Sequence, residues 1–216
     1  MILELDPERD ILGVIDVQPT FMPGGELPVP EGDQVLGPVN RLLARFRHAF
    51  ATQDWHPPGH LSFASSHPGR HPFETIPLAY GPQTLWPDHA VQETPSAALH
   101  PALRQGPIEL VVRKGFRREI DSYSAFFEND RTTATALAEW LRARGFRRIF
   151  FAGLALDFCV AYSAEDATRL GFESYVVRDA CRGVGLPDGA ATTIETALAR
   201  MAACGVRFFT LAELGA

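Results

Sequence analysis

Three residues that could carry out nucleophilic catalysis stand at the ends of apolar, strand-like segments. Cys159 follows the apolar run 149–152 and a glycine, where a helical pattern begins. A thiol at the start of a helix lies near unpaired backbone N–H groups and the positive end of the helix dipole, which favour the thiolate. Asp16 and Lys114 end two other strand-like runs. An acid, a cation and a thiol together indicate a hydrolase with a cysteine nucleophile.

Each of these residues has an ordinary structural explanation when it is considered alone. An acid after a strand is often a turn residue, a lysine there is usually solvated, and a lone cysteine is more often a small buried hydrophobe. The carboxyl ends of parallel strands, however, lie at one edge of a sheet, where ligand sites form. Three matched groups at three strand ends therefore favour one shared active site.

A second cluster has the composition of a metal site. In an extended chain, residues two apart point the same way, so Asp54 and His56 can bind one ion, with His89 joining from the following loop. Imidazole and carboxylate ligands suit one divalent Zn, Fe or Mn ion, and the spacing does not choose among them. Three further histidines are explained as well by a polar loop as by metal binding: His60, His67 and His71.

Strands and helices that alternate along the chain must position these residues. Strand-like runs cover 11–16, 48–52, 109–112, 148–152, 174–177 and 206–210, and helical patterns cover 33–47, 132–144, 156–170 and 188–204. Glycines that suit a left-handed C-cap stand just past the last three helical patterns: Gly145, Gly171 and Gly205. This alternation predicts a three-layer α/β/α fold around a mainly parallel sheet of about six strands.

One long connection interrupts the alternation. Ten of the 17 prolines fall between Pro57 and Pro107, so this stretch cannot be mostly helical. Long loops in compact domains are usually functional or disordered, and the aromatic and apolar residues here favour an ordered loop. We predict a single domain over residues 1–216, with a metal and substrate loop region around residues 54–107.

The composition excludes several classes of function. The net charge is −6 and no basic cluster follows one helix face, so a nucleic-acid surface is not expected. Neither a signal-peptide layout nor a bilayer-spanning apolar run is visible. Three widely separated cysteines do not form a disulfide framework, and Cys181 and Cys204 suit structural roles. We expect a soluble cytoplasmic protein with no membrane partner, where a free thiol persists.

Six segments in the same order closely resemble the nicotinamidase (pyrazinamidase) family. They are residues 16–25 (DVQPTFMPGG), 52–64 (TQDWHPPGHLSFA), 86–92 (WPDHAVQ), 113–115 (RKG), 121–126 (DSYSAF) and 153–160 (GLALDFCV). The resemblance extends from Ile11 to about Arg182. It implies the isochorismatase-like fold of the cysteine hydrolase superfamily.

Carried over position by position, the resemblance implies roles for individual residues. The triad positions are Asp16, Lys114 and Cys159, and the metal positions are Asp54, His56 and His89, with His60 where some members have an added ligand. The walls of the substrate pocket are Phe21, Trp86 and Tyr123. Leu154 and Ala155 also belong to the substrate site, and the bond between them corresponds to a cis peptide of the family. The N–H groups of Ala155 and Cys159 then form the oxyanion hole.

The implied reaction is hydrolysis of nicotinamide to nicotinate and ammonia through a thioester, in NAD salvage. Pyrazinamide is a further expected substrate, and a homo-oligomer is compatible with the pattern. Ala90, Glu93 and Leu156 depart from residues common in the family and put substrate preference and rate in question. Asp179 and Arg182 are expected to form a supporting ion pair.

Competing functions remain to be weighed against this one. The nearest is another cysteine amidase of the superfamily, which acts on a carbamoyl or ureido substrate and often lacks the metal. Isochorismatase does not use the thiol, so Cys159 counts against it. A nucleotide-binding module needs a glycine-rich turn straight after the first strand, whereas Asp16 is followed by Val-Gln-Pro-Thr-Phe. A catalytically dead binding protein is improbable with the triad intact.

Overall fold

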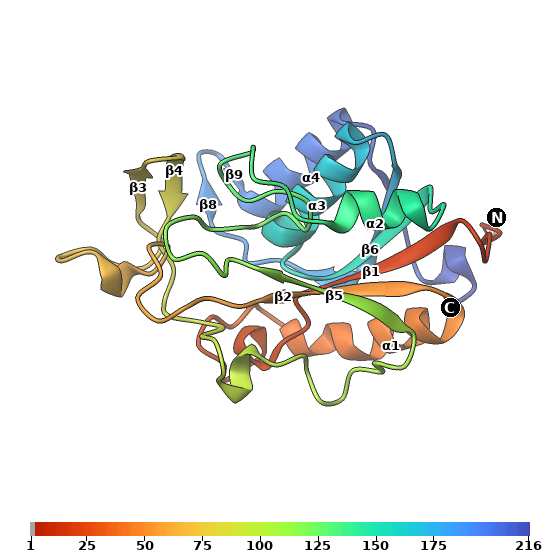
Figure 1. Cartoon of the computed structure of the whole chain (residues 1–216), viewed down its shortest axis with the longest axis horizontal. Helices are drawn as coiled ribbons and strands as arrows, with labels where there is room; N and C mark the ends of the chain where they lie inside the picture. Colours follow the sequence, from red (N-terminus) through yellow and green to blue (C-terminus); the bar gives the residue numbers. More distant parts are fainter. Residues whose placement is uncertain (1–2) are drawn as a thin grey trace.

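A six-stranded parallel sheet forms the middle layer of the computed structural model, which describes residues 3–216 (Figure 1). Its strand order is β10-β7-β6-β1-β2-β5. The strands are β1 (Asp10–Ile15), β2 (Ala49–Asp54), β5 (Ile108–Lys114), β6 (Arg148–Leu154), β7 (Glu173–Arg182) and β10 (Arg207–Phe209). Every pairing between neighbours is parallel, so all six carboxyl ends lie at one edge. The six predicted strands are all present.

Helices cover both faces of this sheet. Helix α1 (Leu36–Arg45) lies on one face, and α2 (Leu137–Ala143), α3 (Ala161–Arg169) and α4 (Thr193–Ala203) lie on the other (Figure 1). Alternate residues of β1 supply the two cores: Leu12 and Val14 pack on the α1 side, and Ile11 and Ile15 on the opposite side. The predicted three-layer α/β/α architecture is confirmed.

The helices are shorter than their sequence patterns predicted. Helix α4 begins at Thr193 and not at Asp188, because Thr192 and Glu195 form a capping box that defines the N-terminus. The residues before it form a short hairpin of β8 (Pro187–Asp188) and β9 (Ala191–Thr192). The three predicted C-cap glycines do have positive φ: 79° at Gly145, 90° at Gly171 and 92° at Gly205.

The long proline-rich connection folds back against the carboxyl edge of the sheet. It contains one hairpin that the sequence did not predict, β3 (Thr75–Leu78) with β4 (Gly81–Thr84). The His56 N–H donates to Ala90 O at 3.0 Å, and the Gln92 N–H donates to His56 O at 2.9 Å. These bonds place the end of β2 beside the segment that carries His89, as the predicted metal site requires.

One predicted contact is wrong. Asp179 accepts hydrogen bonds from the Leu211 backbone N–H at 3.0 and 3.1 Å. Arg182 forms its ion pair with Glu31 at 3.2 Å. The register of β7 shifts against β6 in this segment, and the two side chains bind different partners instead of each other. All three cysteines are free, and within residues 3–216 no helix combines the length and apolar character that crossing a bilayer requires.

Candidate active site

A buried ammonium group links the candidate catalytic residues. Lys114, the last residue of β5, places its Nζ 2.8 Å from Asp16 Oδ2 and 2.6 Å from Asp54 Oδ1. The same Nζ donates to Cys159 Sγ at 3.5 Å and to Ser122 O at 3.2 Å. Carboxylate oxygens of the two acids and Cys159 Sγ all lie within 4.8 Å of one another. The structure thus brings Asp16, Lys114 and Cys159 together, as the sequence predicted, and adds Asp54 as a second acid.

The backbone around the nucleophile explains how the sulfur reaches this cluster. Cys159 lies in a π-helical turn, Leu156–Val160, that joins β6 to α3. Gly153, before this turn, has a φ of 121°, and a Cβ there would lie 2.1 Å from Ile15 O, so only glycine permits this approach to β1. The Leu154–Ala155 bond is cis, as the family resemblance implies.

The cysteine environment favours the thiol and not the thiolate expected from a helix start. Burial raises the pKa of Cys159 well above its ordinary value; the Lys114 ammonium opposes this rise, while the Asp16 and Asp54 carboxylates add to it. Cys159 is also the fourth residue of the turn and not its first. The nucleophile therefore needs a base at the moment of attack.

The two acids differ in their readiness to take that proton. Burial raises the pKa of Asp16, and the neighbouring Asp54 charge adds to the rise although Lys114 opposes it. Burial would also raise the pKa of Asp54, but Lys114 and the two nearby histidines together hold it well below its ordinary value. Neighbouring carboxyls whose pKa values are pushed apart take different roles. Asp16 is suited to accept a proton, whereas Asp54 stays ionised.

One oxygen of Asp16 is available for proton transfer. Thr52 Oγ1 donates to Asp16 Oδ1 at 2.6 Å and itself accepts from the Asp16 N–H at 3.1 Å. The buried Oδ2 atom faces Lys114 in the ion pair, but no residue within 3–216 directs a hydrogen bond at it with good geometry. A proton released by Cys159 can therefore bind at Oδ2.

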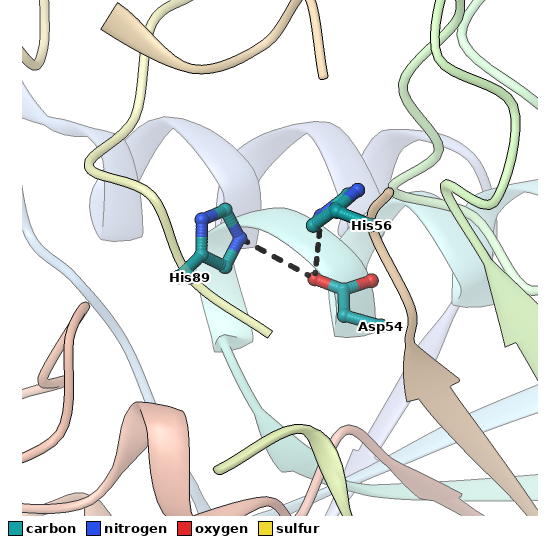
Figure 2. Close-up of side chains that lie close together, drawn as sticks. All are labelled: Asp54, His56 and His89. Atoms are coloured by element: carbon teal, nitrogen blue, oxygen red, sulfur yellow. Dashed lines mark ion pairs between the residues drawn. The ribbon is translucent and has the colours of Figure 1, made fainter. Parts of the chain in front are cut away.

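Asp54, His56 and His89 form a buried cluster that fits a divalent cation. Asp54 Oδ2 lies 3.7 Å from the Nε2 atoms of both histidines, whose rings approach the same carboxylate oxygen (Figure 2). His56 Nδ1 lies 3.0 Å from Gly115 O, and His89 Nδ1 lies 2.8 Å from Pro87 O. A carbonyl only accepts, so each Nδ1 carries a proton, and each Nε2 is the ring atom that is left to bind a cation beside Asp54. This donor set is typical of a zinc, iron or manganese ligand group.

The neighbouring His60 is held in a different way. Its Nδ1 accepts from the Ser62 N–H at 3.1 Å and lies 2.7 Å from Ser62 Oγ. Its Nε2 lies 3.3 Å from Ile120 O, so this atom donates. Burial, with His56 close by, lowers the pKa of His60 to about 4, and the ring is neutral. Although His60, His56 and Asp121 form a second close group, both ring nitrogens of His60 are already engaged.

Cys159 lines a small cavity of about 30 Å³, which Asp54 and His89 of the metal cluster also line. Its walls include the predicted residues Phe21, Trp86, Tyr123, Ala155 and Cys159, with Asp54 and His89 contributing polar atoms. Trp86 Nε1 donates to the Tyr123 hydroxyl at 3.1 Å, which holds the two rings edge to face. Leu154 does not line the cavity; it is fully buried in the core on the α1 side, because its side chain points away from the sulfur.

Sequence reasoning missed several residues of the cavity wall: Leu27, Val29, Asp121, Phe158 and Val184. Phe158 could have been found, because it directly precedes the nucleophile. The aliphatic residues come from segments without periodic pattern and carry no signal of their own. The three departures from the family pattern lie outside the lining: Ala90 and Leu156 are buried elsewhere and Glu93 is exposed.

Comparison with known proteins adds independent findings. The isochorismatase domain model matches residues 10–213. The chain is 49% identical over 194 residues to the nicotinamidase of Acinetobacter baylyi, covering 90% of this chain and 89% of the relative. It is 43% identical over 213 residues to the nicotinamidase of Escherichia coli, covering 96% and 97%.

Solved structures are similar over nearly the whole chain. A nicotinamidase/pyrazinamidase from Acinetobacter baumanii superposes with a TM-score of 0.93 and 44% identity, covering 97% of this chain and all of the other. PnC1 from L. infantum in complex with nicotinate has a TM-score of 0.84 and 35% identity, covering 99% and 98%. The pyrazinamidase of Pyrococcus horikoshii in complex with zinc has a TM-score of 0.74 and 34% identity, covering 94% and 99%.

Proposed function

This chain belongs to the isochorismatase family, and we propose that it is a nicotinamidase that hydrolyses nicotinamide to nicotinate and ammonia. The observation that carries the proposal is the buried contact of Cys159 Sγ with Lys114 Nζ, which also pairs with Asp16 and Asp54. The curated relatives at 49% and 43% identity are nicotinamidases, which supports the same substrate. Pyrazinamide, a similar aromatic carboxamide, is the second proposed substrate.

In the first half of the reaction, Cys159 Sγ attacks the carboxamide carbon while Asp16 Oδ2 takes the thiol proton. Lys114 stabilises the developing negative charge, since its ammonium lies between both groups. The backbone N–H groups of Ala155 and Cys159 are suited to hold the oxyanion, at about 3 kcal/mol per donor. The C–N bond then breaks, Asp16 returns the proton to the leaving nitrogen, and ammonia departs from a thioester.

The second half of the reaction uses the same groups. Asp16, again ionised, takes a proton from a water molecule that attacks the thioester carbonyl. The C–S bond breaks, the proton returns to Cys159 Sγ, and nicotinic acid leaves and loses its carboxyl proton to solvent as nicotinate. Asp54 stays ionised throughout because Lys114 and the two histidines hold its pKa low. This division of labour lets one acid shuttle protons while its neighbour keeps a fixed charge.

Asp54, His56 and His89 are the residues that would hold a divalent metal ion. When bound, such an ion supplies a Lewis acid that can anchor the pyridine nitrogen and withdraw electrons from the ring. His56 and His89 are oriented for this by their Nδ1–H bonds to Gly115 and Pro87. The zinc-bound pyrazinamidase of Pyrococcus horikoshii supports zinc, while iron and manganese fit the same donors.

The aromatic walls orient the substrate ring. Trp86 and Tyr123 form one wall of the cavity, and Phe21 adds a further aromatic surface beside His89, with the Phe21 and His89 ring centroids 5.7 Å apart. A flat heteroaromatic ring fits between such surfaces, whereas an open-chain ureido substrate makes less use of them. A role in NAD salvage, a cytoplasmic location and a homo-oligomer stay predictions.

The test is ammonia release by the purified protein. We expect turnover of nicotinamide and pyrazinamide, and much slower turnover of a ureido substrate such as ureidoacrylate. Elemental analysis of the same preparation should find about one divalent metal per chain. A preparation that holds metal and hydrolyses the ureido compound but neither aromatic carboxamide would refute the proposed substrate.

A further inference from the structure

The reaction cavity is too small for the proposed substrate as it stands. Its volume is about 30 Å³, whereas an apolar protein cavity that holds a benzene ring has about 150 Å³. At least one wall must therefore move when an aromatic carboxamide binds. The wall that moves must have free volume behind it.

A second cavity of about 320 Å³ lies next to the first, and Phe158 is the one residue of the described chain that lines both. Its far walls come from β3 and the segment just before it, from β4, the β8–β9 hairpin, α3 and α4. They include Phe73, Thr84, Tyr162 and Thr196. The second cavity has the volume that the first one lacks.

Phe158 can move at less cost than the other two rings of its aromatic cluster, Trp86 and Tyr123. Its ring contacts Trp86 and Tyr123 edge to face, with centroids 4.9 and 5.5 Å away, and it has no polar atom to leave unpaired. Trp86 and Tyr123, in contrast, are tied by the hydrogen bond between them, and Gln83 Nε2 also donates to the Tyr123 hydroxyl at 3.0 Å. Phe158 is half-buried, while Trp86 is buried. A rotated Phe158 would meet the aromatic walls of the second cavity, Phe73 and Tyr162.

We propose that Phe158 is a specificity-determining residue that swings into the second cavity when substrate binds, so that the free space there sets the size of ring the enzyme accepts. The inference rests on the proposed function in that the ligand is a small aromatic carboxamide. A Phe158 displacement is a change between side-chain rotamers and needs no movement of the sheet or of Cys159. The second cavity thus acts as a receiving space and not as a binding site of its own.

The test fills the second cavity and measures whether the resulting change in KM depends on Phe158. Thr196→Phe places a ring in the second cavity from α4, and Thr196→Ser is the matched control. We expect Thr196→Phe to raise KM for nicotinamide about tenfold with little change in kcat. In a Phe158→Ala background, the same substitution should change KM less than about twofold, because no ring then needs the space. Calorimetric Kd values for nicotinate should follow the same pattern.

A second set of substrates tests size selection directly. Nicotinamides that carry a phenyl group at ring carbon 4, 5 or 6 should be poor substrates of the native enzyme. Phe158→Ala should raise kcat/KM for at least one of them about tenfold or more relative to nicotinamide, and adding Thr196→Phe should remove the gain. Phe158→Leu and Thr196→Leu serve as milder variants if a larger change prevents folding.

The outcomes separate this inference from the proposed function. A native enzyme that does not hydrolyse nicotinamide refutes the function. An active native enzyme in which Thr196→Phe leaves KM and Kd unchanged, or affects them equally with and without Phe158, overturns the role of Phe158. So does a folded Phe158→Ala or Phe158→Leu enzyme that gains no activity on any of the phenyl derivatives.

Discussion

The charged groups of the site come from strand ends, whereas its aromatic walls come from loops. Asp54 and Lys114 are the last residues of β2 and β5, and Asp16 directly follows β1. Phe21, Trp86 and Tyr123 lie in segments that contain no regular strand. The ladder of a buried sheet holds charges to within a fraction of an ångström, which proton transfer needs. Loops are held by fewer hydrogen bonds than strands, so the shape of the pocket walls can vary more than the positions of the charged groups.

The metal cluster combines the two regions. Asp54 belongs to a strand end, His56 lies two residues beyond it, and His89 comes from the loop. Gly115 allows this meeting, because a Cβ there would lie 2.3 Å from the His56 ring. We therefore expect substitutions at the strand ends to abolish catalysis. Substitutions in the metal cluster should lower metal affinity, and substitutions in the loops should mainly alter substrate affinity.

The largest effect is expected at the strand ends, from Lys114→Met. Removal of the ammonium leaves two buried carboxylates facing each other, which should cost about 3–5 kcal/mol of unfolding free energy. The kcat should fall by about 100-fold or more, because charge in the transition state loses its partner. Arg113→Met, on the same strand, is the control; it loses a stacking contact with Trp55 worth about 1 kcal/mol. Denaturant unfolding and ammonia release measure both effects. A Lys114→Met protein that is as stable and as active as the native one would show that the charged groups at the strand ends are not required for catalysis.

The next largest effect is expected in the metal cluster, where substitutions of His89 and of the neighbouring His60 should differ in how far they lower metal affinity. His89→Ala removes a nitrogen that faces Asp54 Oδ2 and should weaken metal affinity roughly 100-fold or more. His60→Ala should weaken it less than about tenfold, since both its nitrogens serve Ser62 and Ile120. Metal competition titrations of the two variants give the comparison. Equal losses would make His60 a ligand.

A smaller effect is expected where the nucleophile turn meets a wall loop. Asp157 accepts from the backbone N–H groups of Val184 and Gly185, each at 2.9 Å, and Val184 lines the reaction cavity. In Asp157→Asn, the side-chain NH₂ replaces one of the two accepting oxygens and faces a backbone N–H group. This loss of an acceptor should cost about 1–3 kcal/mol of unfolding free energy. KM for nicotinamide should rise more than kcat falls. Asp188→Asn, on the exposed hairpin β8–β9, is the control and should change neither.

The smallest effect should come from the loop wall itself, in Tyr123→Phe. The ring stays, but the indole N–H of Trp86 and the amide of Gln83 lose their acceptor, at about 1 kcal/mol each. We expect a several-fold rise in KM and an almost unchanged kcat. Tyr175→Phe, at a distant position on β7, should leave KM unaltered. A large fall in kcat for Tyr123→Phe would show that loops, too, take part in the chemistry.

The same division explains what could be predicted from the sequence. The continuous apolar run that ends in Asp16 reveals both the strand and the residue at its end, because buried parallel strands have that pattern. Lys114 ends an edge strand with alternately exposed residues, and the apolar residues 110–112 just before it are enough to locate that strand. Asp54 and His56 are visible from their spacing, because residues two apart in an extended chain point the same way. Val29 and Val184 enter the cavity from irregular segments whose path depends on long-range bonds, such as those to Asp157, and no local pattern reports this. The raised pKa of Cys159 could not be read from the sequence either, because it comes from burial and from the Asp16 and Asp54 carboxylates, which only the fold brings to the sulfur.

The proposed reaction requires that the sulfur of Cys159 attacks the amide while Asp54, His56 and His89 remain a separate, intact cluster. Cys159→Ala removes the sulfur alone, and ammonia release from nicotinamide and metal content are measured on the same folded preparation. We expect no ammonia above the uncatalysed background and a metal content equal to that of the native protein. Ammonia release at a rate close to the native one, from a variant that lacks the thiol, would contradict it.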